Sequence, residues 1–267
     1  MRFQHFIDSL PILGVFLAFA VVALIMSEGG YRLGHWWQER TPDEKDGPTN
    51  MIVGALLALM AFLLAITMSM ASDRFDTRRG LVLAEANSVG TTYLRAGYLP
   101  EPAAAELRDL LREYVPLRIV TNDLAELRAK MARSTEIHAM LWSITEGLAR
   151  ANPESQVLAI FIESLNETID LHETRTIAGL YARVPETILI LLLLGSMLTL
   201  WMVGYNAGLT RRRSPLTAVV LIVILGAVIT LVIDLDRPRD GFLTVSQQPL
   251  LDLLQQVESP SPRITHP

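Results

Sequence analysis

The stretch Met51–Leu94, MIVGALLALMAFLLAITMSMASDRFDTRRGLVLAEANSVGTTYL, decides the fold, and its character changes halfway. Its first half is apolar and uncharged over the roughly 20 residues that a helix needs to cross a bilayer. Its second half is charged but contains no proline, so nothing in the sequence ends the helix at the membrane surface. We therefore expect one long helix that spans the membrane and continues into water. Gly80 and Gly90 are its weak points, since each costs about 1 kcal/mol relative to alanine.

Small side chains recur along the spanning half of this helix at spacings of three and four residues, which places them on one face. This small-residue stripe consists of Gly54, Ala58, Ala61, Ala65, Ser69 and Ser72. In lipid, such a stripe usually packs closely against another helix. Alternatively, it lines a narrow conduit in an oligomer, with the hydroxyls of Thr67, Ser69 and Ser72 near one mouth.

The composition predicts an all-α integral membrane protein. Hydrophobic residues make up 51% of the chain, cysteine is absent and the net charge is -5, which argues against a disulfide scaffold and against nucleic-acid binding. Four blocks without charge are long enough to span: Ser9–Ser27, Met51–Ser72, Thr187–Thr210 and Ser214–Ile233. We expect a first transmembrane pair in residues 1–72, a soluble helical domain in 73–183, a second transmembrane pair in 184–233, and a C-terminal segment with a disordered tail in 234–267.

The soluble domain is expected to be helical throughout, because no strand-like alternation occurs in it. Apolar spacing predicts helices from about Pro102 to Tyr114, over residues 121–132, and over residues 134–150. The sequence Asn152-Pro153-Glu154 is typical of a helix start and predicts a fourth helix that continues toward Ala178. A short helix at PLLDLLQQV precedes the polar tail ESPSPRITHP, which we expect to be disordered.

Two glycines and a cluster of charges near the ends of the later spans also lead to predictions. Gly204 and Gly208 are a small pair suited to close helix packing. Asp234, Asp236 and Arg237 follow the fourth apolar block directly, and a carboxylate this near hydrocarbon needs a partner. The natural partners of Asp234 are Arg78 and Arg79; the alternative is an exposed interfacial charge cluster.

Glu85 and Asn87 are polar groups on the long helix just beyond Arg78 and Arg79. In one interpretation they form a gate or a hydrogen-bond cluster between subunits. In the other they only support the helix locally, for instance through a charge pair between Glu85 and one of these arginines. We favour local support, because exposed helix charges usually do no more.

The sequence holds no enzyme motif that we can identify, and we expect neither a catalytic site nor a cofactor. The five histidines are scattered, without the spacing of a zinc site. His172 and Glu173 could join Glu163, Glu167 and Asp170 in an acidic cluster that holds a metal, but a solvated helix surface is the better interpretation. No metal site is therefore predicted.

Four pieces of the sequence, RFDTRR (74–79), EANSVGTTYLRA (85–96), LLREYV (110–115) and LDRPRDG (235–241), resemble the bestrophin-like domain family of bacterial membrane proteins. This resemblance implies the layout of bestrophins, pentameric anion or cation channels with four membrane helices per subunit and a large cytosolic helical part. No bestrophin pore residue carries over, because the aromatic and isoleucine neck has no match in the second spanning block.

Basic residues flank the spans on both sides and do not decide the orientation by themselves. The run Arg211-Arg212-Arg213 favours a cytoplasmic connection between the last two spans, whereas the larger number of arginines beside the central segment favours the opposite. The resemblance favours a cytoplasmic central domain and a place in the bacterial inner membrane.

Two functions compete. In the first, the chain is a homo-oligomeric ion channel whose second spanning helix lines the pore. Asp73 and Asp76 would then form rings that favour cations, unless Arg74, Arg78 and Arg79 cancel or reverse that preference. In the second, the chain is a non-conducting scaffold or sensor whose central domain binds a cytosolic protein. The expected partners are membrane lipid and further copies of the chain, with no nucleic acid.

Overall fold

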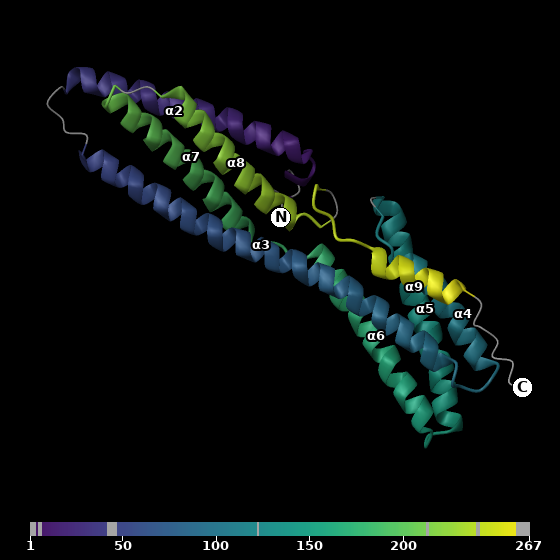
Figure 1. The fold of residues 1–267 in the computed structure, drawn as a ribbon. Helices are drawn as coiled ribbons and strands as arrows, with labels where there is room; N and C mark the ends of the chain where they lie inside the picture. Colours follow the sequence, from purple (N-terminus) through teal and green to yellow (C-terminus); the bar gives the residue numbers. More distant parts are fainter. Residues whose placement is uncertain are drawn as a thin grey trace, which may run out of the picture. The chain divides into compact units, whose positions relative to one another are not determined.

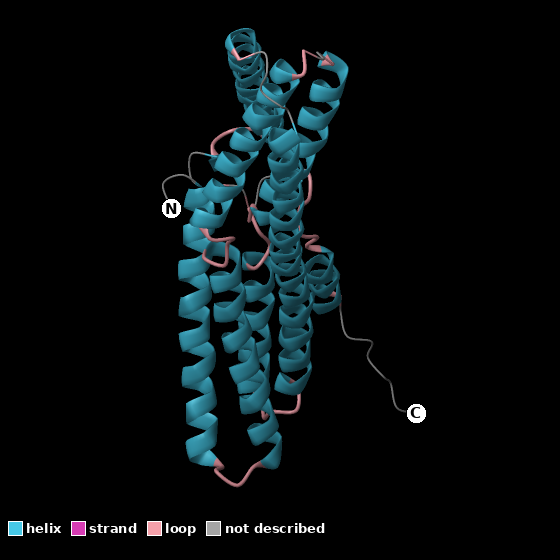
Figure 2. Cartoon of the chain, turned by 90° about the vertical axis from the view of Figure 1, so that its left-hand side faces the viewer, coloured by secondary structure: helices cyan, strands magenta, loops and turns pink. Residues whose placement is uncertain are grey.

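The computed structural model describes residue 4 and residues 7–41, 47–121, 123–211, 214–238 and 241–259. The predicted tail lies outside these residues except for its first two, Glu258, which ends the last helix, and Ser259. Within them the labelled helices are α2 (Ile12–Arg40), α3 (Gly47–Ala96), α4 (Ala103–Leu117), α5 (Leu124–Ala151), α6 (Gln156–Leu180), α7 (Glu186–Leu209), α8 (Pro215–Asp236) and α9 (Gln248–Glu258) (Figure 1). Figure 2 shows helices and loops but no strand in the described part of the chain, which confirms the all-α prediction.

Four helices, α2, α3, α7 and α8, are long and apolar enough to cross a membrane, as the four apolar blocks predicted. Helices α4, α5 and α6 lie between the second and third spans in the chain. The first helix is longer than its apolar block: α2 continues to Arg40 and carries Trp36 and Trp37 with exposed side chains. The chain is thus a multi-pass membrane protein with an inserted helical segment.

Helix α3 runs for 50 residues without interruption, so the prediction of one long helix is confirmed. Neither glycine breaks it. A Cβ at Gly80 would meet nothing within 4 Å, and a Cβ at Gly90 would meet only the side chain of Leu253, at 3.2 Å. The helix begins at Gly47, four residues before the apolar block.

The chain forms two compact units, each described separately below. The membrane unit contains residues 1–75 and 183–244, and the central unit contains residues 76–182 and 245–267. Helix α3 contributes its first part to the membrane unit and its second part to the central unit.

In the membrane unit, α2 and α7 approach so closely that only glycine fits at their contact. A Cβ at Gly204 would lie 2.0 Å from the carbonyl oxygen of Ser27, and one at Gly208 would lie 2.3 Å from that of Tyr31. On α2, a Cβ at Gly30 would lie 2.0 Å from the carbonyl oxygen of Trp201. The predicted close packing at Gly204 and Gly208 is therefore confirmed, and its counterpart on α2 is a second set of glycines.

The apolar core of the membrane unit lies among the four spans, which run side by side in Figure 1. Phe19 of α2, Leu192 and Leu200 of α7, and Ile222 and Ile229 of α8 are all buried in it. Helix α3 contributes Met60, whose sulfur lies against Gly195. The spans α2, α7 and α8 thus form a packed bundle that α3 joins through a single face.

In the central unit, the second part of α3 packs with α4, α5, α6 and α9 around one core. Its largest fully buried side chains include Leu107, Tyr114, Ile137, Phe161 and Leu250. The presence of Leu250 shows that α9 belongs to this core, although about 65 residues of sequence separate it from α6. The C-terminal helix therefore completes the central unit.

Two helix boundaries in the central unit differ from the prediction. The runs 121–132 and 134–150 form a single helix, α5, since no proline or glycine lies between them. The hydroxyl of the buried Ser134 donates to the carbonyl of Lys130 one turn earlier. Helix α6 begins at Gln156, where the hydroxyl of Ser155 accepts from the N–H of Leu158. Asn152 ends α5 instead of starting α6.

Candidate functional site

The small-residue stripe on α3 faces away from the rest of the described chain. Gly54, Ala58, Ala61, Ala65 and Ser69 are exposed, and Ser72 is half-buried. The buried residues of this part of α3 are Met60, Thr67 and Ala71, which lie on the opposite face of the helix. Among the described residues, no neighbouring helix of the same chain covers the stripe, so it is a free surface of the single subunit.

Four of the five charged residues that follow the stripe divide between two faces of α3, and the fifth, Arg74, is half-buried. Asp73, Asp76 and Arg79 are exposed, whereas Arg78 is buried. Asp76 follows Ser72 by four residues and Ser69 by seven, so helical spacing places it in line with the stripe. That Asp234 pairs with Arg78 or Arg79 stays a prediction.

A buried ionic network surrounds Glu85 in the central unit. Its carboxylate is fully buried and accepts from Nε of Arg118 on one oxygen, at 2.6 Å, and from a guanidinium nitrogen of Arg175 on the other. Arg175 also donates to Oε1 of Gln247 at 2.8 Å. The network therefore links α3, α6 and the segment before α9 to Arg118, the residue directly after α4.

Aromatic groups cover this network. The hydroxyl of Tyr114 lies 3.0 Å from Nδ1 of His172 and 3.3 Å from Oε1 of Glu85. The ring of His138 stands edge-on to that of His172, with their centroids 4.7 Å apart. Burial, with a smaller contribution from the charge of Arg118, lowers the pKa of His138 to about 4 and that of His172 to about 3. Both imidazoles are therefore neutral at pH 7.

Burial also raises the pKa of the Tyr114 phenol above its ordinary value. Tyr114 thus remains a neutral hydroxyl that can donate to the Glu85 carboxylate. Two guanidinium groups and one carboxylate leave this interior with one positive charge, which adds to the larger effect of burial in keeping the neighbouring imidazoles unprotonated.

The expectation of an exposed, locally supported Glu85 is wrong. The carboxylate is fully buried, and its partners come from residues 33 and 90 positions further along the chain. Asn87 is exposed and takes no part in this network. The sequence offered one signal: Glu85 lies in EANSVGTTYLRA and Tyr114 lies in LLREYV, two pieces that resemble the same family. Spacing alone cannot reveal a pairing between distant helices.

Two of the histidines that looked scattered, His138 and His172, lie against each other. His172 is buried, whereas Glu163, Glu167 and Asp170 of the same helix are exposed. Among the described residues, no group of three potential ligands could hold a metal ion.

A second ionic network, partly buried, lies in the membrane unit near the start of α7 and the end of α8. Arg183 donates to both oxygens of Asp8, at 2.5 and 3.1 Å, and to Oδ2 of Asp236 at 3.1 Å. The other oxygen of Asp236 accepts from the N–H of Val184 at 2.7 Å. Arg237 donates to the carbonyl of Ile7 at 2.6 Å and to that of Leu10. The predicted charge cluster is thus buried, and the interpretation of an exposed interfacial cluster is wrong.

Comparison with known families identifies the chain. The model of the bestrophin-like domain matches residues 15–250, which is most of the sequence. The chain belongs to the bestrophin-like domain family. No protein with a curated description matches it in sequence.

Solved structures share the fold of this bestrophin-like chain. One is a bacterial bestrophin homolog from Klebsiella pneumoniae in which a tryptophan is replaced by alanine; it has a TM-score of 0.68 at 17% identity, over 92% of this chain and 98% of that one. A second variant of that homolog, with a tyrosine replaced by alanine, has a TM-score of 0.66 at 17% identity, over 92% and 99% of the two chains. At these identities the similarity establishes the fold alone.

Three of the four sequence pieces that resemble the bestrophin-like family contribute residues to the two ionic networks. EANSVGTTYLRA carries Glu85, LLREYV carries Tyr114, and LDRPRDG carries Asp236 and Arg237. In this bestrophin-like chain, Glu85 and Tyr114 therefore stabilise the interior of the central unit, and Asp236 and Arg237 stabilise that of the membrane unit.

Proposed function

We propose that this bestrophin-like chain forms a homo-oligomer in which copies of α3 surround an ion-conducting path. The observation that carries the proposal is the exposure of the small-residue stripe while the opposite face of α3 is buried in its own subunit. A helix that packs on one face and presents small side chains on the other leaves room for a water-filled lumen between copies.

The chemistry of the stripe suits such a path. Its apolar part consists of glycine and alanine, whose side chains are small. Ser69 and Ser72 add hydroxyls at the end that is nearer the central unit in the sequence. Asp76, exposed and in register with these serines, would form a ring of carboxylates in the oligomer and favour cations. Arg79, also exposed, would oppose that preference.

The expected number of subunits and the orientation in the membrane rest on the resemblance to bestrophins. We expect five copies, a central unit in the cytoplasm and a location in the bacterial inner membrane. The alternative function is a non-conducting scaffold or sensor whose central unit binds a cytosolic protein.

Substituted cysteines test the pathway directly, because the natural chain contains no cysteine. Ala61→Cys and Ala65→Cys on the stripe should react with a charged, water-soluble thiol reagent and lose current in planar bilayers. Leu59→Cys and Ile66→Cys are matched controls on exposed positions of the same helix outside the stripe, and they should resist the reagent in lipid. Equal protection of both sets, with no conductance, would leave the scaffold as the better function.

Ion preference tests the carboxylate ring. Asp76→Asn should shift the reversal potential away from cations under a salt gradient. Asp170→Asn removes the same charge from an exposed position of α6 and should leave the reversal potential unchanged. An unchanged preference in Asp76→Asn would remove this residue from the pathway without contradicting the pore itself.

A further inference from the structure

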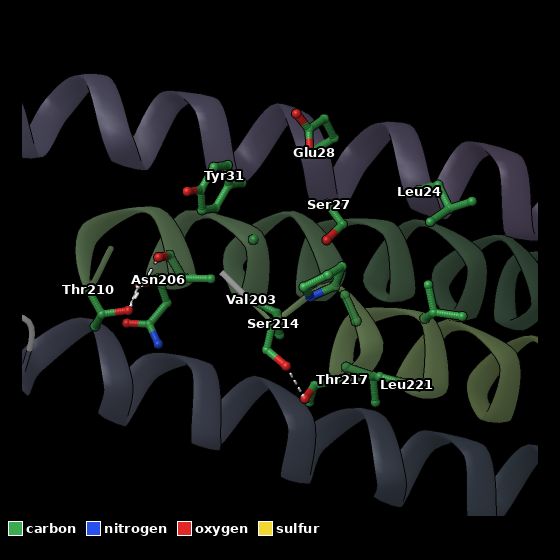
Figure 3. A pocket seen from close by; sticks show the side chains of 15 residues that line it. Leu24, Ser27, Glu28, Tyr31, Val203, Asn206, Thr210, Ser214, Thr217 and Leu221 are labelled. Atoms are coloured by element: carbon green, nitrogen blue, oxygen red, sulfur yellow. Dashed lines mark hydrogen bonds between the residues drawn. The ribbon is translucent and has the colours of Figure 1, made fainter. Parts of the chain in front are cut away.

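A pocket opens in the membrane unit among α2, α7 and the start of α8 (Figure 3). Its volume is about 470 Å³, within the range of roughly 300–1,000 Å³ that small-molecule pockets occupy. All the lining residues belong to the membrane unit, and none belongs to the small-residue stripe or to either ionic network. The pocket is therefore separate from the proposed pathway.

The direction of the helices gives the pocket two different ends. Helices α2 and α7 run the same way, since Ser27 lies against Gly204 and Tyr31 against Gly208. Helix α8 runs back, beginning at Pro215. Thr210 at the end of α7 and Ser214 before α8 consequently share one end of the pocket, about 10 Å of helix away from Val203.

The inner end is apolar, whereas the outer end is polar. Leu24, Val203 and Leu221 line the inner part, one from each helix. At the outer end the hydroxyls of Ser214 and Thr217 lie 2.7 Å apart, and that of Thr210 donates to the carbonyl of Asn206 at 3.0 Å (Figure 3). Hydroxyls keep acceptor capacity after donating one hydrogen bond, so this end can still bind a polar group.

Charged groups of both signs lie at the pocket or next to it in the chain. Glu28 is one of its lining residues, and its carboxylate accepts from Nε of Arg32 at 2.9 Å. Arg211 directly follows Thr210 in the turn between α7 and α8, its side chain is exposed, and its backbone has a φ of 53°. The sequence places two further arginines after it. Basic side chains at the end of spanning helices attract anionic headgroups, at about 1 kcal/mol each.

We infer that this pocket binds one anionic glycerophospholipid. Its acyl chain enters toward Leu24, Val203 and Leu221, and its glycerol phosphate meets the hydroxyls of Thr210, Ser214 and Thr217 with Arg211 beside them. The occupant is a lipid because the apolar end lies within the spanning helices and the polar end lies where those helices terminate. The inference does not depend on conduction or on the number of subunits.

Photo-crosslinking tests the site in the intact protein. The full chain is placed in phosphatidylcholine nanodiscs that contain a small fraction of photoactivatable phosphatidylglycerol, and the labelled peptides are mapped by mass spectrometry. Labelling should concentrate on the pocket segments of α2, α7 and α8, and unlabelled phosphatidylglycerol should compete better than phosphatidylcholine. Labelling spread evenly over all four spans would overturn the inference.

Two variants separate the pocket from the general lipid surface. Leu221→Trp fills the inner end and should lower labelling of the pocket peptides by about tenfold. Leu216→Trp makes the same change on the same helix at a position that is 75% exposed and outside the pocket, and it should leave labelling unchanged. Equal labelling of the two variants would contradict the site.

Arg211→Gln tests the headgroup without disturbing the packed helices, so it remains informative if Leu221→Trp fails to fold. At low salt it should reduce labelling about fivefold, the factor that corresponds to one lost arginine near a lipid phosphate. Full displacement of the probe by inorganic phosphate would show that the site takes a free anion, and crosslinks between two copies through the pocket would show that a second chain occupies it. Either result would overturn the lipid assignment.

Discussion

The carboxylate of Asp234 occupies the space that a side chain at Gly241 would need. A Cβ at Gly241 would lie 2.3 Å from Oδ1 of Asp234, far inside van der Waals contact. The two carboxylate oxygens accept from the N–H groups of Phe242 and Leu243, each at 2.9 Å. A buried acceptor at the end of α8 thus fixes the segment that follows it, and glycine is the residue that permits this approach.

Gly241→Ala should destabilise the protein by about 1–3 kcal/mol, because Asp234 must move and leave backbone donors unsatisfied. Thermal unfolding of the purified protein measures the effect. Gly147→Ala is the matched control, since a Cβ there meets nothing within 4 Å in the interior of α5. That change should stabilise the helix by up to about 1 kcal/mol. A stabilised Gly241→Ala would show that the segment is not held by Asp234.

Substitution of the adjacent glycines Gly29 and Gly30 on α2 should have opposite effects on stability. A Cβ at Gly30 would lie 2.0 Å from the carbonyl oxygen of Trp201, whereas a Cβ at Gly29 would meet nothing within 4 Å. Gly30→Ala should therefore push α2 away from α7, lower the free energy of unfolding by about 1–3 kcal/mol and lower the unfolding temperature. Gly29→Ala should leave it unchanged or raise it. Equal unfolding temperatures for the two variants would contradict the close packing of these helices.

Removing the charge of Glu85 should be among the most costly single changes in the central unit. Glu85→Gln leaves Arg118 and Arg175 buried without a counter-ion, which costs about 3–5 kcal/mol. Glu113→Gln is the control: this exposed carboxylate pairs with Arg133, and surface pairs contribute about 0–1 kcal/mol. Chemical denaturation followed by circular dichroism compares the two. A loss in Glu85→Gln no larger than in Glu113→Gln would mean that solvent reaches the network.

The sequence predicted the elements of the membrane unit well, because each depends on local properties. A long uncharged run predicts a span, and Gly204 and Gly208 predict close packing by their spacing alone. The boundary between α5 and α6 was harder to place. Asn152-Pro153-Glu154 has the composition of a helix start, but the hydroxyl of Ser155 makes the cap instead.

The networks could not be predicted, because their partners are distant in the chain. Glu85 was expected to pair with an arginine one or two turns away, which is the only choice that local spacing offers. Instead, packing of α3 against α4 and α6 brings Arg118 and Arg175 to it, and the same packing brings His138 and His172 together. The role of a glutamate such as Glu85 depends on whether it is buried, and the periodicity of the sequence does not reveal the burial of a single polar residue.

Acid should destabilise the central unit through His138 and His172. Their folded pKa values, about 4 and about 3, lie below the ordinary histidine value of about 6.5 because burial and the Arg118 charge disfavour protonation. As the pH falls below about 6.5, the unfolded chain binds protons that the folded chain does not, so the free energy of unfolding decreases. It decreases by at most about 1.4 kcal/mol per pH unit for each histidine until the folded pKa is reached.

Unfolding temperatures of the purified protein at pH 7.5 and pH 5 measure this dependence. His138→Phe removes one of the two titrating groups, and Nε2 of His138 has no hydrogen-bond partner to lose. The difference between the two temperatures should therefore be smaller in this variant than in the natural protein. An equally large difference would mean that other groups cause the acid sensitivity. A natural protein that is equally stable at both pH values would mean that the imidazoles take up protons in the folded state as readily as in water.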